Sequence, residues 1–246
     1  MTLTQDDPVD LNTLEGPMRT YVYRPAAPGK YPGLVLWSEI FNVTDPIRRT
    51  AMTMAGHGFI VVVPEVYHEF EPAGKVLAYD QAGAERGNFL KTEKELSSYD
   101  SDAEAAVDFL EKHPLSTGKV GSMGMCLGGH LSMRCAKNPR VSAAVCLYAT
   151  DIHQRSLGRG KNDNTLDLIP EIKAELLLIW GRQDPHVPSE GRAKIYEALA
   201  KGNCDFQWHE FNGAHAFIRD EGTRYDPVLA RESYGLAVEL FKRKLV

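Results

Sequence analysis

The stretch that decides how this chain folds is residues 119–130, KVGSMGMCLGGH, in which Gly124, Cys126 and Gly128 follow one another at every second position. A short apolar run enters this stretch and an amphipathic helical pattern follows it. This order predicts a sharp strand-to-helix turn of the nucleophile-elbow type. The tip of such a turn is strained, so its neighbours two positions away must lack a Cβ. We expect Cys126 to be exposed at the tip and to favour its thiolate, because the positive end of the helix dipole lies beside it.

The motif alone leaves a second interpretation open, a glycine-rich turn that holds a buried structural cysteine. The other cysteines are Cys135, Cys146 and Cys204, and none of the four has metal-ligand spacing. We therefore expect no metal site. Residues 1–7 have neither a basic region nor an apolar core, so we expect no signal peptide, a cytoplasmic location and free thiols.

The bulk properties favour one large α/β domain and exclude several classes of partner. A chain of 246 residues suits one α/β domain over residues 1–246 with an ample core. A net charge of −5 argues against nucleic acid or an anionic membrane as the main partner. No apolar run reaches the roughly 18 residues of a membrane span.

Apolar runs alternate with helical patterns along the chain, which predicts a mainly parallel sheet with right-handed crossovers. We expect an N-terminal strand pair at residues 9–14 and 18–24, and buried strands at residues 33–37, 59–64, 141–148, 176–180 and 206–211, besides the elbow strand. We expect helices that begin with Asp45 as N-cap, near Asp102, after Cys126, at residues 189–201 and after Asp226.

Two polar segments interrupt this alternation. Residues 65–99 are predicted to form a variable cap or rim with a solvated helix around residues 91–95. Residues 150–168 are predicted to be an insertion over the sheet edge.

Three reactive side chains follow three of the expected strands: Cys126, Asp184 and His215. The carboxyl ends of parallel strands gather at one edge of a sheet, so we expect these side chains to meet. Their chain order, nucleophile, acid and histidine, is that of the α/β-hydrolase fold. In this chemistry His215 takes the thiol proton and later protonates the leaving group, while Asp184 orients the imidazole. No metal or organic cofactor is required.

The chain resembles the dienelactone hydrolase (carboxymethylenebutenolidase) family over nearly its whole length. Four motifs carry the resemblance: Glu39-Ile40-Phe41, residues 124–129 (GMCLGG), Gly181-x-x-Asp184-x-x-Val187-Pro188, and Gly213-x-His215-x-Phe217. The resemblance implies an α/β-hydrolase fold with helices on both faces of the sheet. It also implies hydrolysis of a lactone or small ester and a monomer or weak homodimer.

The resemblance also implies roles for individual residues. The backbone N–H groups of Leu127 and Ile40 would form an oxyanion hole. Glu39 would lie beside the thiol and help to control its ionisation when substrate arrives. Arg219 stands where the family places an arginine that grips the substrate carboxylate.

The family's second carboxylate-binding arginine has no clear counterpart. Its expected position falls near Ala84, and Arg86 is the nearest basic residue. Because the substrate-facing segments depart from the family pattern, hydrolysis is better supported than dienelactone as the substrate. A general carboxylesterase or thioesterase without a carboxylate anchor, and a non-catalytic small-molecule receptor on the same fold, stay open.

Overall fold

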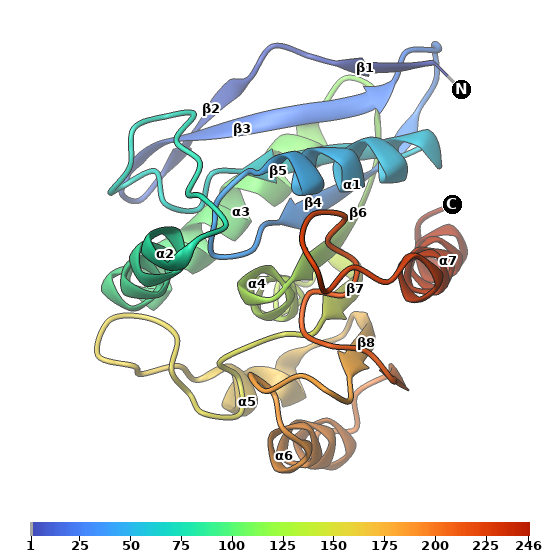
Figure 1. Ribbon diagram of the computed structural model, residues 1–246. Helices are drawn as coiled ribbons and strands as arrows, with labels where there is room; N and C mark the ends of the chain where they lie inside the picture. The colour runs from blue at the N-terminus through green and yellow to red at the C-terminus, as the bar shows by residue number, and fades with distance from the viewer. Residues whose placement is uncertain (1) are drawn as a thin grey trace.

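Nine strands of the computed structural model, which describes residues 2–246, form one mainly parallel sheet (Figure 1). In chain order the strands are β1 (Leu3–Gln5), β2 (Val9–Thr13), β3 (Gly16–Pro25), β4 (Tyr31–Trp37), β5 (Ile60–Pro64), β6 (Ser116–Met125), β7 (Val141–Leu147), β8 (Glu175–Gly181) and β9 (Phe206–Phe211). They lie in the order β1, β3, β5, β4, β6, β7, β8, β9, and β2 pairs with β3.

The sheet divides into an antiparallel end and a parallel body. Strand β3 runs antiparallel to β1, β2 and β5, whereas β4 to β9 are parallel to their neighbours within that group. The carboxyl ends of β4, β6, β8 and β9 therefore open at one edge of the sheet, where ligands of such folds bind.

Helices cover both faces of this sheet (Figure 1). They are α1 (Asp45–Gly56), α2 (Gln81–Glu93), α3 (Leu96–Lys112), α4 (Leu127–Cys135), α5 (Thr165–Leu168), α6 (Ser189–Lys201) and α7 (Pro227–Leu245), with a 3-10 turn at Ile169–Glu171. Helices α1 and α7 pack on one face, and α3 and α4 pack on the other, where side chains of α6 also join the core.

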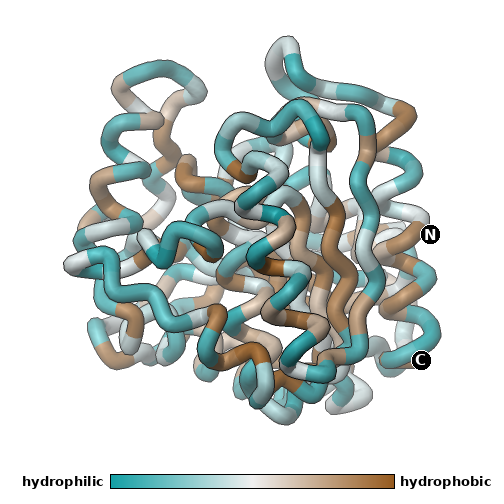
Figure 2. Tube along the Cα trace, turned by 90° about the horizontal axis from the view of Figure 1, so that it is seen from below, coloured by the Kyte–Doolittle hydropathy of each residue, from teal (hydrophilic) through white to brown (hydrophobic). Residues whose placement is uncertain are grey.

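The strand period of two produces two apolar layers. In β4, Leu34 and Leu36 belong to the layer under α1 and α7, while Val35 and Trp37 belong to the layer under α3 and α4. Figure 2 shows the apolar segments along the central strands and the polar ones in the surrounding loops. Within residues 2–246 no helix combines the length and the apolar character that a bilayer crossing needs.

The predicted fold class, a mainly parallel sheet between two layers of helices, is confirmed. Two local predictions were wrong. Helix α1 has Thr44 rather than Asp45 as its N-cap, and helix α3 begins at Leu96 rather than near Asp102. Strand β1 was not predicted.

Residues 91–95 are not a solvated helix. They contain the end of α2 and the start of a bend, and Lys94 is fully buried. Its ammonium group forms ion pairs with Glu69 and, at 3.1 Å, with Asp102. Lys94 thus belongs to a buried ionic cluster, because a buried lysine requires charged partners.

Candidate active site

Cys126 occupies the tip of the turn between β6 and α4, with φ 57° and ψ −120°. The glycines around it are required by close backbone approach. A Cβ on Gly124 would lie 2.0 Å from the Gly128 carbonyl oxygen, and one on Gly128 would lie 2.2 Å from that of Trp37. The expected exposure was wrong, since Cys126 is only 8% exposed. The thiol reaches solvent through a cavity that the surrounding loops enclose.

His215 and Asp184 follow the neighbouring strands β9 and β8, and their side chains meet. Asp184 Oδ2 lies 2.6 Å from His215 Nδ1, and both residues are buried. The other carboxylate oxygen, Oδ1, accepts the backbone N–H of His186 at 2.8 Å. Because Nδ1 faces the carboxylate, Nε2 is the nitrogen available for proton transfer.

The environment of His215 favours its protonated form. Burial by itself lowers the pKa of the imidazole, but a thiolate at Cys126 and the Asp184 carboxylate outweigh it and raise the pKa to about 10. Burial raises the pKa of Asp184, and the hydrogen bond and charge of His215 turn the net shift downward. The net effect favours an imidazolium at His215, which lines the same cavity as Cys126.

A cavity of about 320 Å³ connects these groups to the surface. Cys126 and His215 line it together with Glu39, Ile40 and Arg219. This volume lies at the small end of the range for ligand pockets.

The oxyanion hole expected from the N–H groups of Leu127 and Ile40 stays a prediction, for which the structure gives the position of each residue. Leu127 is the first residue of α4, where a helix leaves its N–H without an intrahelical partner. Ile40 follows β4 and lines the same cavity. Helix α2 packs closely against the Ile40 peptide through Gly87. A Cβ on Gly87 would lie 2.3 Å from the Ile40 carbonyl oxygen.

Glu39 and Arg219 form a buried pair at the cavity wall. Arg219 Nη1 lies 3.4 Å from Glu39 Oε2, and the side chains are 10% and 4% exposed. Arg219 Nε donates to the carbonyl oxygen of Glu221 at 3.1 Å. Both predicted residues therefore lie at the cavity, and the Glu39 carboxylate contacts the Arg219 guanidinium.

Arg86 does not lie at the cavity. Its guanidinium pairs with Glu71 at 2.7 Å on the surface. The cavity face of α2 carries Ala84, Asn88 and Lys91, which are spaced four and three residues apart as one helical face requires. Arg86 stands two residues after Ala84 and therefore points to another side of the helix.

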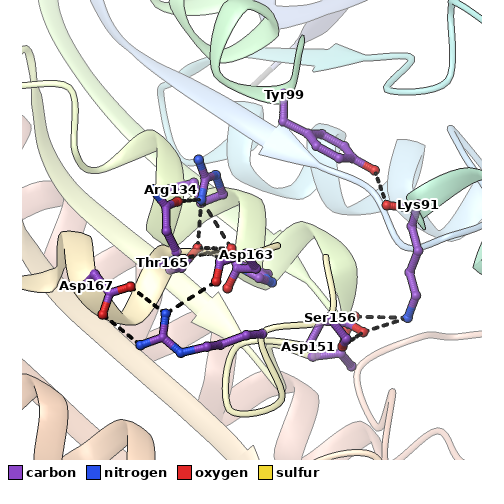
Figure 3. A network of polar contacts seen from close by, with 12 residues as sticks. Lys91, Tyr99, Arg134, Asp151, Ser156, Asp163, Thr165 and Asp167 are labelled. Carbon is purple, nitrogen blue, oxygen red and sulfur yellow. Dashed lines mark hydrogen bonds and ion pairs between the residues drawn. The ribbon is translucent and has the colours of Figure 1, made fainter. Parts of the chain in front are cut away.

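Lys91 is the basic residue that α2 presents to the cavity, and sequence reasoning missed it (Figure 3). Its Nζ lies 2.8 Å from Asp151 Oδ1. The Thr150 hydroxyl donates to Asp151 Oδ2 at 2.6 Å and lies 4.0 Å from Cys126 Sγ. Positions four and seven residues after Ala84 lie on the same helical face, so this spacing could have identified Lys91. Nothing in the sequence indicated its partner, Asp151, which lies on a distant loop.

The loop that carries Thr150 and Asp151 is tied down at its far end by Arg134 of α4 (Figure 3). Arg134 Nη1 donates to Asp163 at 3.2 Å and to Thr165 at 3.0 Å, and all three residues are buried. The polar composition of residues 150–168 thus reflects an anchored cavity wall.

The sequence profile of the Dienelactone hydrolase family matches residues 18–245. A protein of Saccharomyces cerevisiae that carries the provisional name carboxymethylenebutenolidase is 42% identical over 239 residues, which cover 93% of this chain and 87% of the yeast protein. The carboxymethylenebutenolidase of Pseudomonas putida is 30% identical over 202 residues, with 81% of each chain covered.

The fold has close counterparts among solved structures. A crystal structure from Klebsiella pneumoniae, provisionally described as a dienelactone hydrolase, superposes with a TM-score of 0.86. It covers 98% of this chain and 99% of its own, at 21% identity.

The sheet order, the elbow and the residues at the carboxyl edge of the sheet define an α/β-hydrolase. Within that class the chain belongs to the dienelactone hydrolase family. It is accordingly a hydrolase of ester or lactone bonds.

Proposed function

We propose that this chain is a cysteine hydrolase that opens a lactone or cleaves a small carboxylic ester through a thioacyl-enzyme. The observation that supports it most directly is the convergence of the Cys126 tip and the Asp184–His215 pair on one cavity. The catalytic groups are Cys126, His215 and Asp184.

In the first half-reaction, the Cys126 thiolate attacks the acyl carbon and a tetrahedral oxyanion forms. The N–H groups of Leu127 and Ile40 stabilise that charge. The carbon–oxygen bond to the leaving group then breaks, and the His215 imidazolium gives its proton to the departing alkoxide. For a lactone, this alkoxide stays attached to the acyl chain.

In the second half-reaction, neutral His215 takes a proton from water, and the resulting hydroxide attacks the thioester carbon. Collapse of this intermediate releases the carboxylic acid and restores the thiolate beside the imidazolium. Asp184 holds the imidazole by Nδ1 in both halves.

Arg219 is proposed to bind a substrate carboxylate, which a planar guanidinium suits. Lys91 and Arg224 also line the cavity and add positive charge. An anion that draws Arg219 away from Glu39 would free that carboxylate beside the thiol, so we propose that Glu39 controls thiol ionisation when substrate arrives.

The second candidate function is a general carboxylesterase or thioesterase that uses the same catalytic groups without a carboxylate anchor. The pairing of the cavity cations favours it, because Arg219 faces Glu39 and Lys91 faces Asp151 in this structure.

Steady-state hydrolysis of a dienelactone and of p-nitrophenyl acetate, by wild type, Cys126→Ala and Arg219→Ala, separates these functions. We expect wild type to turn over dienelactone more efficiently, Cys126→Ala to be inactive on both substrates, and Arg219→Ala to lose only the anionic one. Equal activity of Arg219→Ala on dienelactone supports the general esterase. Activity of Cys126→Ala close to wild type contradicts the cysteine mechanism.

A further inference from the structure

We propose that Tyr79 is a positioning residue that holds the Arg219 guanidinium in the orientation that selects a negatively charged substrate. This inference rests on the anchoring role proposed for Arg219. Tyr79 does not line the cavity and acts only through the residues that do.

The first observation is that the Tyr79 ring supports the guanidinium plane. Arg219 Cζ lies 4.2 Å from the centroid of the ring, within the range of a cation–π contact. Phe41 in turn packs edge-on against Tyr79, with centroids 4.7 Å apart. The hydrogen bonds of Arg219 to the Glu221 carbonyl oxygen at 3.1 Å and to Glu39 at 3.4 Å hold the edge of the guanidinium. The Tyr79 ring supports its flat face.

The second observation is that the Thr44 side chain does not cap its helix by a hydrogen bond. Thr44 is the N-cap of α1, where a threonine side chain normally accepts a backbone N–H of the first turn. Its side chain makes no such cap here, and Oγ1 lies 2.7 Å from the Tyr79 hydroxyl. A local rule broken beside a functional site indicates that the contact serves that site.

The hydroxyl of Tyr79 is oriented by its acceptor. It lies 3.4 Å from Glu39 Oε2, and a carboxylate only accepts. The phenol donates to Glu39 at this longer distance, and either oxygen of the shorter Thr44–Tyr79 hydrogen bond can be its donor. Burial, followed by the charge of Glu39, holds the pKa of Tyr79 well above its usual range, so the proton stays in place at working pH.

The backbone around Tyr79 is attached to the loop that carries Glu39 and Ile40. The Leu77 N–H donates to the Phe41 carbonyl oxygen at 3.1 Å, and Asn42 Nδ2 donates to that of Lys75 at 2.8 Å. These bonds hold the segment that precedes Tyr79 against the loop of the cavity wall. Residues 65–99, which were predicted to form a cap or rim, therefore also contain Tyr79, the residue that supports Arg219.

The test compares Tyr79→Phe, Tyr79→Leu, Tyr79→Met and Arg219→Ala with wild type on two matched esters. The esters are p-nitrophenyl hydrogen glutarate, which carries a carboxylate, and p-nitrophenyl pentanoate, which has the same carbon chain without it. KM and kcat are measured separately, and thermal unfolding confirms that each variant is folded. Tyr79→Met provides a second ringless side chain in case Tyr79→Leu does not fold.

We expect Tyr79→Leu and Tyr79→Met to raise KM for the glutarate about tenfold, as loss of a buried cation–π contact predicts, with little change in kcat or in the pentanoate reaction. Tyr79→Phe keeps the ring and should keep the selectivity. Equal loss of selectivity in Tyr79→Phe, or unchanged selectivity in both ringless variants, overturns the inference. If Arg219→Ala leaves the glutarate preference intact, the anchor itself fails, and this is visible independently of any Tyr79 variant.

Discussion

Lys91 and Asp151, which are 60 residues apart in the chain, form an ion pair with Nζ 2.8 Å from Oδ1 at the cavity wall. The lysine comes from α2 and the aspartate from the loop after β7. The pair therefore fastens the two polar segments to each other beside Cys126, and it leads to two predictions.

Removing the lysine alone should destabilise the protein. Lys91→Met leaves Asp151 buried with only the hydroxyl groups of Thr150 and Ser156 as partners. Truncating one partner of a buried pair costs about 3 kcal/mol of unfolding free energy. Urea unfolding measures this cost, and the double variant Lys91→Met/Asp151→Asn should recover a large part of it. A cost below about 0.5 kcal/mol would mean that the pair is solvated.

Acid should also weaken the fold through Asp151. Burial raises the pKa of this carboxyl, but Lys91 and Thr150 outweigh it and lower the pKa from 3.8 to about 2. The stabilisation is therefore complete above pH 4 and is lost as the pH falls from 4 through 2. It amounts to about 2 kcal/mol. The difference in unfolding free energy between wild type and Asp151→Asn should shrink across this window, and a constant difference contradicts the prediction.

The elbow glycine Gly128 should tolerate no Cβ. Gly128→Ala places a methyl group 2.2 Å from the Trp37 carbonyl oxygen, so we expect a loss of more than about 3 kcal/mol. Gly235→Ala is the matched control, because it lies inside α7 with open space around it. That variant should gain about 0.5–1 kcal/mol. Similar unfolding midpoints for both variants would falsify the packing argument.

The pKa of His215 should depend on Cys126. In wild type the imidazole pKa is raised to about 10, and the thiolate is the largest of the causes that raise it. Cys126→Ala removes that charge, so the pKa should fall markedly in an NMR titration of the histidine ring. A group with a raised pKa stabilises the fold most below its unfolded value near 6.5. The stability advantage of wild type over Cys126→Ala should therefore decline from pH 6.5 to 10, and an unchanged titration in the variant argues against the ion pair.

Asp184 is proposed to set the tautomer of His215, so its substitution should lower kcat. Asp184→Asn keeps the side-chain shape but replaces the acceptor at His215 Nδ1, so kcat should fall roughly 10²- to 10⁴-fold with little change in KM. Arg86→Ala serves as the surface control, because its guanidinium pairs with Glu71 and lies outside the cavity. It should leave both constants unchanged, and a raised KM for anionic esters in that variant would restore Arg86 as a substrate contact.

Features that depend on local pattern and backbone sterics could be predicted from the amino-acid sequence. Helix α6 and strand β9 have the predicted bounds, because their periodicity and end residues act over a few positions. The elbow follows from the spacing of its glycines. The meeting of Cys126, Asp184 and His215 follows from strand order, since parallel strands bring their carboxyl ends to one edge.

Which polar side chains face the cavity and which are buried could not be predicted, because it depends on how distant segments pack. Lys94 looked solvated and is fully buried, because Glu69 and Asp102 surround it. Lys91 rather than Arg86 faces the cavity, and its partner Asp151 comes from another part of the chain. Tyr79 reached Arg219 and Thr44 in the same way. Such contacts depend on the packing of distant segments, and neither propensity nor spacing along the chain encodes them.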